Sequence, residues 1–301
     1  MQPARFNHPD FPDHALLDSG DGEKLERFGE VVLRRPDPQA LWGRRLGKSA
    51  WDSAHLSFVR ESDRGGRWQP SKDAPSVARG RDAEWGIRWG SANLIVRPTP
   101  FKHLGVFPEQ AANWAWLTEL KERFDTDRPR LLNLFGYSGA ASVVAAQAGY
   151  EVTHVDASRT SLAWAGENAA ASGLGEKPWR VLLEDAPTFV KREVRRASKY
   201  ELILLDPPHY GRGPAGEKWD LTTSLAPLLN GVREILSDQS AACLSTYAVG
   251  ISPLSLVGAL GVLGDGDVEA GELALPEESL AEGEARLLPA GFCARFMRGL
   301  A

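Results

Sequence analysis

The segment from Asp206 to Tyr210, which reads Asp-Pro-Pro-His-Tyr, has the residue types best suited to chemistry in this chain. The apolar run Leu202 to Leu205 precedes it and is typical of a buried parallel strand. The segment is therefore expected at the carboxyl end of a strand, where open α/β sheets bind their ligands. Because prolines lack N–H donors, the carbonyls of Asp206 and of both prolines are predicted to accept hydrogen bonds from an amino group on a flat molecule. Tyr210 would stack on that molecule; a plain proline turn with a surface tyrosine is the alternative.

Alternating strands and helices are predicted from Arg130 onward, which favours a parallel sheet with helices on both faces. The predicted strands are residues 131–135, 152–155, 179–183, 202–205 and 241–247, and the predicted helices are residues 140–148, 158–171, 186–198 and 222–236. Two further apolar runs, 268–275 and 285–297, flank an acidic loop and indicate a terminal hairpin. The carboxyl ends of the parallel strands should then meet at one edge of the sheet.

Residues 133–139, Asn-Leu-Phe-Gly-Tyr-Ser-Gly, form a strand-to-helix turn in which two glycines let the backbone approach a ligand closely. Asp156 ends the second predicted strand about 20 residues after Gly136, a spacing at which a carboxylate accepts hydrogen bonds from ribose hydroxyls. Asp185 ends the third strand and is suited to the exocyclic amine of an adenine, with a helix N-cap as the alternative. Together, these strand ends predict a nucleoside site.

An NAD-binding enzyme is the competing interpretation of this βαβ pattern. The turn lacks the third glycine of the G-x-G-x-x-G fingerprint, with Ala141 and Ser142 nearby. No dinucleotide fingerprint explains the proline pair after the fourth strand. Both features count against NAD.

The chain has 301 residues, 43% hydrophobic and 25% charged, which is ordinary for a globular protein and leaves room for two domains. Two cysteines are too few for a disulfide framework, and the N-terminus leads into no apolar signal segment, so a cytoplasmic location is expected. The uncharged stretch 239–264 is long enough to suggest a membrane span, but its proline, glycines and hydroxyl residues favour a strand, a turn and a helix. No metal site is expected.

Residues 1–100 are predicted to form a small β-rich domain, because short apolar runs alternate there with Gly, Pro and Asp clusters, and residues 101–301 form the second domain. The net charge of -5 argues against a nonspecific nucleic-acid coat. Basic residues nevertheless exceed acidic ones in the first part, where arginines such as Arg34, Arg35, Arg44 and Arg45 are interleaved with tryptophans. Arginine and tryptophan together suit phosphate contact and base stacking in RNA. A core of tryptophans under a solvated arginine face is an equally good alternative.

From about Phe101 to its C-terminus, the chain resembles the class I S-adenosylmethionine-dependent methyltransferases. Within them it is similar to the large-subunit ribosomal RNA methyltransferase I and K family and its uncharacterised bacterial relatives. The resemblance rests on residues 107–110 (FPEQ), 134–139 (LFGYSG), 155–158 (VDAS), 184–186 (EDA), 206–210 (DPPHY), 211–219 (GRGPAGEKW) and 288–292 (LPAGF). It implies a Rossmann-like sheet with an antiparallel final strand and S-adenosylmethionine as the cofactor.

The resemblance also implies roles for the matching residues. Gln110, Gly136 and Ser138 would surround the methionine part of the cofactor, Asp156 would bind the ribose and Asp185 would lie beside the adenine. The implied cofactor-binding set is Gln110, Asn133, Phe135, Gly136, Tyr137, Ser138, Gly139, Asp156, Ala157, Ser158, Glu184, Asp185, Ala186 and Asp206. The implied catalytic set, which faces the methyl acceptor, is Asp206, Pro207, Pro208 and Tyr210.

One position departs from the family pattern. Members that methylate carbon 5 of cytosine use a cysteine nucleophile after the fifth strand, and the matching residue here is Ala248. A nitrogen of an RNA base, in ribosomal RNA, is therefore the favoured acceptor. The alternatives are a small-molecule or protein acceptor, or a Rossmann-like NAD-binding oxidoreductase. The glycine-rich stretch from Gly211 to Trp219 is expected to form a lid over the substrate.

Overall fold

The computed structural model describes residues 4–7, 9–62, 65–175, 179–247, 250–278 and 285–300. By internal packing, the chain divides into two compact units. The larger unit comprises residues 1–6, 112–273 and 291–301, and the smaller unit comprises residues 7–111 and 274–290. The sequence pattern places a boundary at residue 100; by packing, residues 101–111 and the distant segment 274–290 also belong to the smaller unit.

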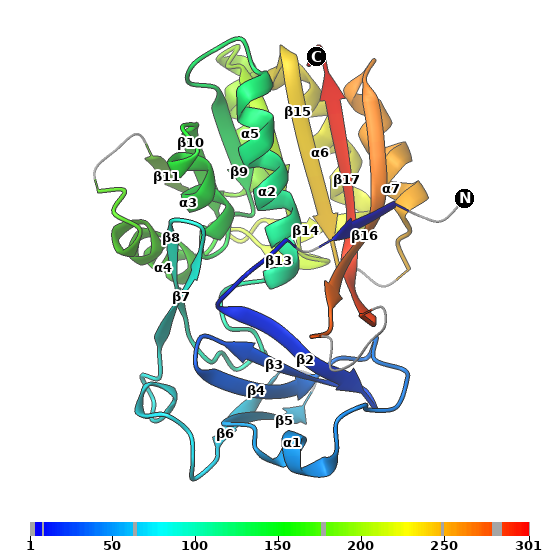
Figure 1. Cartoon of the computed structure of the whole chain (residues 1–301). Helices are drawn as coiled ribbons and strands as arrows, with labels where there is room; N and C mark the ends of the chain where they lie inside the picture. The colour runs from blue at the N-terminus through cyan, green and yellow to red at the C-terminus, as the bar shows by residue number, and fades with distance from the viewer. Residues whose placement is uncertain are drawn as a thin grey trace. The chain divides into compact units, whose positions relative to one another are not determined.

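The described strands of the main sheet lie in the order β1-β16-β17-β15-β12-β9-β10-β11 (Figure 1). Their bounds are β1 Ala4–Asn7, β9 Arg130–Leu134, β10 Glu151–Asp156, β11 Trp179–Leu183, β12 Tyr200–Leu205, β15 Leu236–Thr246, β16 Asp267–Pro276 and β17 Leu287–Arg298. The five strands from β11 to β15 pair in parallel, whereas β17 is antiparallel to β15. This confirms the predicted mostly parallel sheet with an antiparallel final strand.

Helices cover both faces of this sheet, as predicted. α2 (Ala111–Leu120), α3 (Ala140–Gln147) and α4 (Arg159–Ala171) lie on one face, and α5 (Ala186–Arg195), α6 (Leu221–Ile235) and α7 (Pro253–Leu260) lie on the other (Figure 1). Several begin at a side-chain cap that occupies a free N–H of the first turn. The capping residues are Ser158 for α4, Asp185 for α5, Asp220 for α6 and Ser252 for α7.

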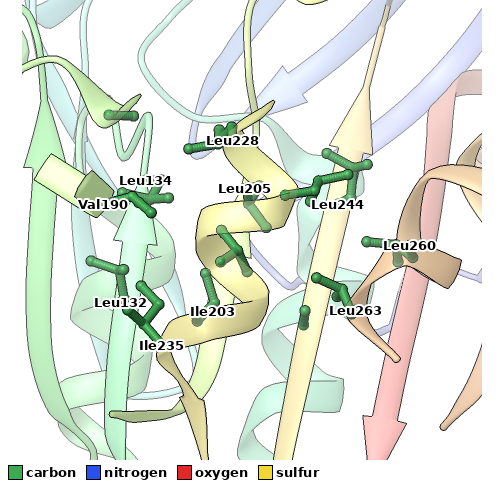
Figure 2. Packing of buried hydrophobic residues seen from close by; sticks show 14 of the residues in the cluster. Leu132, Leu134, Val190, Ile203, Leu205, Leu228, Ile235, Leu244, Leu260 and Leu263 are labelled. Carbon is green, nitrogen blue, oxygen red and sulfur yellow. The ribbon is translucent and has the colours of Figure 1, made fainter. Parts of the chain in front are cut away.

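Buried leucine, isoleucine and valine side chains fill the space between the sheet and α5, α6 and α7 (Figure 2). Ile203 and Leu205 of β12 lie beside Leu132 and Leu134 of β9, and Leu228 and Ile235 of α6 pack over them. A strand covered on both faces has no polar side, which explains the continuous apolar run before Asp206. Burial of each such leucine or isoleucine side chain stabilises the folded state by about 1.5–3 kcal/mol.

The smaller unit contains a five-stranded sheet in the order β2-β3-β4-β5-β6 and a separate two-stranded hairpin, β7–β8, among its described residues. The bounds are β2 His14–Gly20, β3 Glu23–Phe28, β4 Val31–Pro36, β5 Leu56–Ser62, β6 Gly65–Pro70, β7 Trp85–Trp89 and β8 Ala92–Val96, and the short helix α1 spans Lys48–Asp52. The predicted β-rich character of this part is therefore confirmed.

Arginine and tryptophan side chains of the smaller unit are largely bonded within it. Arg34 and Arg44 pair with Glu23, Arg35 pairs with buried Glu26 at 2.6 Å, and Arg45 lies 3.6 Å from Glu277. The indole N–H groups of Trp42, Trp51, Trp68 and Trp85 donate to Ser19, Asp18, Thr99 and Phe28. These contacts fit the alternative of a tryptophan core, except that Arg35 is buried with Glu26 rather than on a solvated face, and these side chains give no support to RNA contact.

The uncharged stretch 239–264 forms most of β15, a turn, α7 and a single 3-10 turn, Gly261–Leu263. This matches the predicted strand, turn and helix. In the part of the chain that the structure describes, no helix combines the length and the apolar character needed to span a membrane.

Candidate functional site

The carboxyl ends of four neighbouring strands lie level at one edge of the main sheet. Leu134 pairs with both Val155 and Leu205, and Asp156 pairs with Leu183. The chain runs outward from β9 to β11 and then returns to β12 on the other side of β9, so the strand order reverses between β9 and β12. Open α/β sheets bind ligands at such a reversal. Four predicted site segments, 135–139, 156–158, 184–186 and 206–210, are thereby brought to this edge.

The loop from Phe135 to Gly139, called the β9–α3 loop below, has an unusual backbone. Phe135, Tyr137 and Gly139 have φ of 57°, 50° and 81°, in the left-handed region that L side chains rarely adopt. Gly139 N–H donates to the Gly136 carbonyl at 3.0 Å, which closes the turn. Surrounding structure must hold this conformation, because each such non-glycine residue costs on the order of 1 kcal/mol or more.

Asp156 is the residue that holds the loop. Its Oδ2 accepts a hydrogen bond from Tyr137 N–H at 2.8 Å, and its Oδ1 accepts one from Ser158 N–H at 2.8 Å. Burial raises the pKa of Asp156, and these N–H donors oppose that rise because they favour the ionised form. Each carboxylate oxygen has two lone pairs, so both can accept a further donor such as a ribose hydroxyl. The geometry therefore fits the predicted ribose contact.

A buried histidine packs against the backbone of the same loop. The His154 ring lies so close to Gly136 that a Cβ on Gly136 would be 2.3 Å from Cε1 and 2.4 Å from Nδ1. Nδ1 lies 3.0 Å from Ser142 Oγ, and the ring stacks on Trp179 at 5.5 Å between centroids. Ser142 Oγ also accepts a hydrogen bond from the Asn133 side-chain amide at 2.8 Å. Asn133, predicted among the cofactor-binding residues, thus directs its amide toward α3.

His154 should leave a signature in the pH dependence of stability. Burial lowers its pKa to about 4, below the ordinary 6.5, so the unfolded chain takes up a proton first as the pH falls. Stability present above about pH 6.5 is then lost as the pH falls to about 4, by roughly 3 kcal/mol. We expect a His154→Gln protein to lack this part of the slope, measured by urea denaturation at several pH values. Equal slopes for both proteins would contradict the assignment.

Residues 184–186, which follow the third strand, serve mainly to cap the N-terminus of α5. Asp185 Oδ2 accepts hydrogen bonds from Thr188 N–H and Oγ1 at 3.1 and 3.0 Å, so the N-cap alternative holds for this oxygen. Oδ1 has no hydrogen-bond partner among the described residues. Glu184 pairs with Arg192, and Ala186 is buried in the first turn of α5. One carboxylate oxygen of Asp185 is thus left for an adenine amine.

The Asp206 to Tyr210 segment differs in one respect from its prediction. Trp219 Nε1 donates to the Pro208 carbonyl at 2.7 Å, so this carbonyl is not left for a ligand as predicted. Its partner lies eleven residues away along the chain and comes close only through the fold. Asp206 is half-buried, Pro207 is buried, and Tyr210 is 67% exposed. The acceptor roles of Asp206 and the Pro207 carbonyl stay predictions.

Trp219 connects this segment to the β9–α3 loop. Its side chain is buried, and its ring packs against Phe135 with centroids 4.8 Å apart. The stretch expected to form a lid is a β-hairpin in which β13 (Tyr210–Arg212) pairs with β14 (Lys218–Asp220) in antiparallel register. Leu221 N–H also donates to the His209 carbonyl at 3.0 Å. The hairpin is thus anchored to the proline segment at its base.

A Trp219→Phe change should test this anchor. Phenylalanine keeps a ring against Phe135 but leaves the Pro208 carbonyl without its donor, at a cost of about 1–3 kcal/mol. We expect that loss of stability together with roughly tenfold slower methyl transfer, because the carbonyl next to the reacting group is no longer held. Trp68→Phe is the matched control, since Trp68 Nε1 donates to the Thr99 carbonyl at 2.8 Å in the smaller unit. Equal loss of transfer in both variants would show a general folding effect.

The larger unit, as described, gives no position at this edge for two predicted residues. Gln110 ends the 3-10 turn Pro108–Gln110 and packs with the smaller unit, so its cofactor role stays a prediction. Ala248 lies outside the described residues. Conversely, the sequence interpretation did not single out His154, and Trp219 entered only as part of a motif. The available signal was a histidine inside an apolar strand, two residues before Asp156.

Comparison with known proteins gives three findings. A family model described as conserved hypothetical protein 95 matches residues 110–220. A solved structure described as the SAM-dependent methyltransferase from Agrobacterium tumefaciens is 39% identical, with a TM-score of 0.91, and the match covers 98% of this chain and 93% of that one. Another solved structure, a methyltransferase complexed with SAH, has a TM-score of 0.70 at 18% identity, with 96% of this chain and 76% of that chain covered; it supports the fold.

The curated relatives are longer proteins. The ribosomal RNA large subunit methyltransferase K/L of Methylococcus capsulatus is 37% identical over 249 residues, which is 80% of this chain but 33% of that protein. The protein of the same name from Shewanella frigidimarina is 38% identical over 109 residues. The chain spans about a third or less of the length of these relatives.

Proposed function

The chain belongs to the S-adenosylmethionine-dependent methyltransferases, and from this premise we propose that it transfers a methyl group to a base nitrogen of ribosomal RNA. Membership of this family, with S-adenosylmethionine as the cofactor, favours a methyltransferase over the alternative of an NAD-binding oxidoreductase. The observation that carries the choice of acceptor is the Asp206 to Tyr210 segment beside the β9–α3 loop, where oxygen acceptors lie next to an exposed aromatic ring.

The relatives support RNA as the substrate class. The relative from Methylococcus capsulatus is named a ribosomal RNA large subunit methyltransferase, and its match covers 80% of this chain. A ribosomal substrate would place the protein in the cytoplasm. A small-molecule or protein acceptor is the competing possibility, which the net charge of -5 permits.

The residues present fit the cofactor. Gly136 and Gly139 let the β9–α3 loop pack closely against His154 and Ala165, Asp156 can accept ribose hydroxyls, and one oxygen of Asp185 can accept an adenine amine. When bound, S-adenosylmethionine supplies a methyl group on a positively charged sulfur. The remaining work of the chain is to hold an acceptor in line with that methyl group, which can account for several kcal/mol of the barrier.

Positioning of the acceptor falls to the proline segment. The Asp206 carboxylate and the Pro207 carbonyl would accept hydrogen bonds from an amino group and aim its nitrogen lone pair, while Tyr210 would stack on the base. A nitrogen with a lone pair needs no covalent activation. The proton that the nitrogen loses after transfer can pass to Asp206 or to solvent.

The cysteines support nitrogen over carbon 5 of cytosine as the acceptor. A carbon 5 mechanism needs a thiolate that can reach the base. The only two cysteines of the chain, Cys243 and Cys293, are buried, and their sulfurs lie 3.5 Å apart across β15 and β17. Both positions are those of core residues rather than of a nucleophile at the strand ends.

The proposal is tested by tritium transfer from labelled S-adenosylmethionine into RNA of a strain that lacks this gene, followed by nucleoside analysis. We expect label in large-subunit ribosomal RNA, in a base methylated on nitrogen. Label on carbon 5 of cytosine would contradict the choice of atom. Label confined to protein or small metabolites would contradict the RNA substrate.

A further inference from the structure

We propose that the outer face of the β13–β14 hairpin, formed by Tyr210, Arg212 and Lys218, binds the RNA strand next to the methylated base. The proposal rests on the RNA substrate of the proposed function and names the surface that recognises it. Tyr210 would stack on the acceptor base, as in the proposed function, and the two cations would hold the phosphates of the neighbouring nucleotides.

The register of the hairpin separates two faces. Gly211 lies opposite Trp219, and Arg212 lies opposite Lys218. Because side chains alternate along a strand, Tyr210, Arg212, Lys218 and Asp220 share the face opposite to Trp219. The exposures agree, since Trp219 is 4% exposed and Tyr210 is 67% exposed. Trp219 thus fixes the inner face, and the outer face is open to solvent.

The outer face carries a net positive charge, because the two cations Arg212 and Lys218 share it with one carboxylate, Asp220. Arg212 and Lys218 are both exposed, and neither side chain has a hydrogen bond or an ion pair among the described residues. Like charges directly opposite on paired strands are destabilising. The nearest carboxylates do not relieve them: Asp220 accepts hydrogen bonds from Thr222 as the cap of α6, and Glu217 accepts one from Ala215 N–H. A bound anion would relieve the repulsion.

The chemistry of the three side chains identifies the anion as a nucleic-acid backbone. Arginine and lysine bind phosphate, and an exposed tyrosine two residues away on the same face can stack on an unpaired base. The hairpin begins at Tyr210, two residues after Pro208, so phosphates held by Arg212 and Lys218 would belong to nucleotides next to the one whose base stacks on Tyr210 and reaches Asp206. Single-stranded RNA, whose bases are open to stacking, fits this arrangement.

The test is fluorescence anisotropy of a labelled 12-residue oligouridylate with the full chain across a series of NaCl concentrations. For Arg212→Gln/Lys218→Gln, we expect about tenfold weaker binding at low salt and a salt slope flatter by about 0.7 for each phosphate that the variant no longer neutralises. Tyr210→Ala should weaken binding on the order of 10-fold at every salt concentration without changing the slope, because stacking carries no charge.

The matched control is Lys191→Gln/Arg195→Gln, which removes the same charge from two exposed α5 residues that have no partner among the described residues. It should bind RNA like the wild type, and calorimetry with S-adenosylhomocysteine should show all variants folded. If the hairpin variant keeps the wild-type salt slope and affinity, or if the control loses as much affinity for RNA as the hairpin variant, the hairpin is not the RNA-binding surface. The proposal of an RNA substrate would still hold. If the wild type shows no salt-dependent binding to RNA, both proposals fail.

Discussion

Replacement of Asp206 by alanine is expected to lower kcat/KM for methyl transfer by about 100- to 1000-fold while leaving the affinity for S-adenosylhomocysteine within about tenfold of the wild type. Asp206 directly follows Leu205, which pairs with Leu134 immediately before the β9–α3 loop. Under the proposed function, its carboxylate would lie where the methyl donor and the acceptor meet. Loss of the group that aims the acceptor removes orientation, to which methyl transfer is most sensitive.

An Asp206→Asn protein sharpens this test. The amide keeps the size of the side chain and one acceptor oxygen but replaces the other oxygen with a donor and removes the negative charge, so transfer should stay below that of the wild type. Asp238→Ala is the control, because Asp238 is exposed near the start of β15, at the opposite end of that strand from the site. Rates would be measured with the RNA that accepts tritium. Full transfer by Asp206→Ala would show that Asp206 does not position the acceptor.

Sequence predicts a part of the fold well when a short stretch of residues has a single physical cause for its pattern, such as burial on both faces of a sheet. The run Leu202 to Leu205 is apolar throughout because β12 is covered on both faces, and this was enough to place the proline segment at a strand end. Asp156 was found from its spacing to Gly136, and the structure adds that the same carboxylate holds the loop through Tyr137 N–H. Local patterns thus predicted the cofactor edge of the sheet.

The contacts that sequence could not predict join residues far apart in the chain. The Pro208 carbonyl was assigned to a ligand, because nothing local shows that Trp219 reaches it. Segment 274–290 packs with the smaller unit partly through Glu277, whose carboxylate accepts a hydrogen bond from Ser19 at 2.6 Å. The arginines of that unit pair with glutamates of β3, which composition does not reveal. In each case the partner is set by tertiary packing.

A second large effect is expected when Gly136 is replaced by alanine: affinity for S-adenosylhomocysteine should fall on the order of 100-fold. The added Cβ would lie 2.3 Å from His154 Cε1, well inside van der Waals contact. His154 cannot swing aside, because it is fully buried, bonded to Ser142 and stacked on Trp179. The β9–α3 loop must therefore move, and with it the Tyr137 N–H that bonds Asp156.

The cause of that loss can be isolated with a double-mutant cycle. In Gly136→Ala/His154→Ala the opposing ring is gone, so affinity should recover relative to Gly136→Ala, with a coupling energy of about 1–3 kcal/mol between the two sites. Gly166→Ala is the control for the glycine change, because a Cβ there meets nothing within 4 Å. It lies within α4, where alanine should stabilise the helix by about 1 kcal/mol without affecting binding. Calorimetry gives the affinities and urea denaturation gives the stabilities. Additive effects of Gly136→Ala and His154→Ala would mean that the histidine ring does not hold the loop in its binding conformation, and that Gly136 is required for another reason.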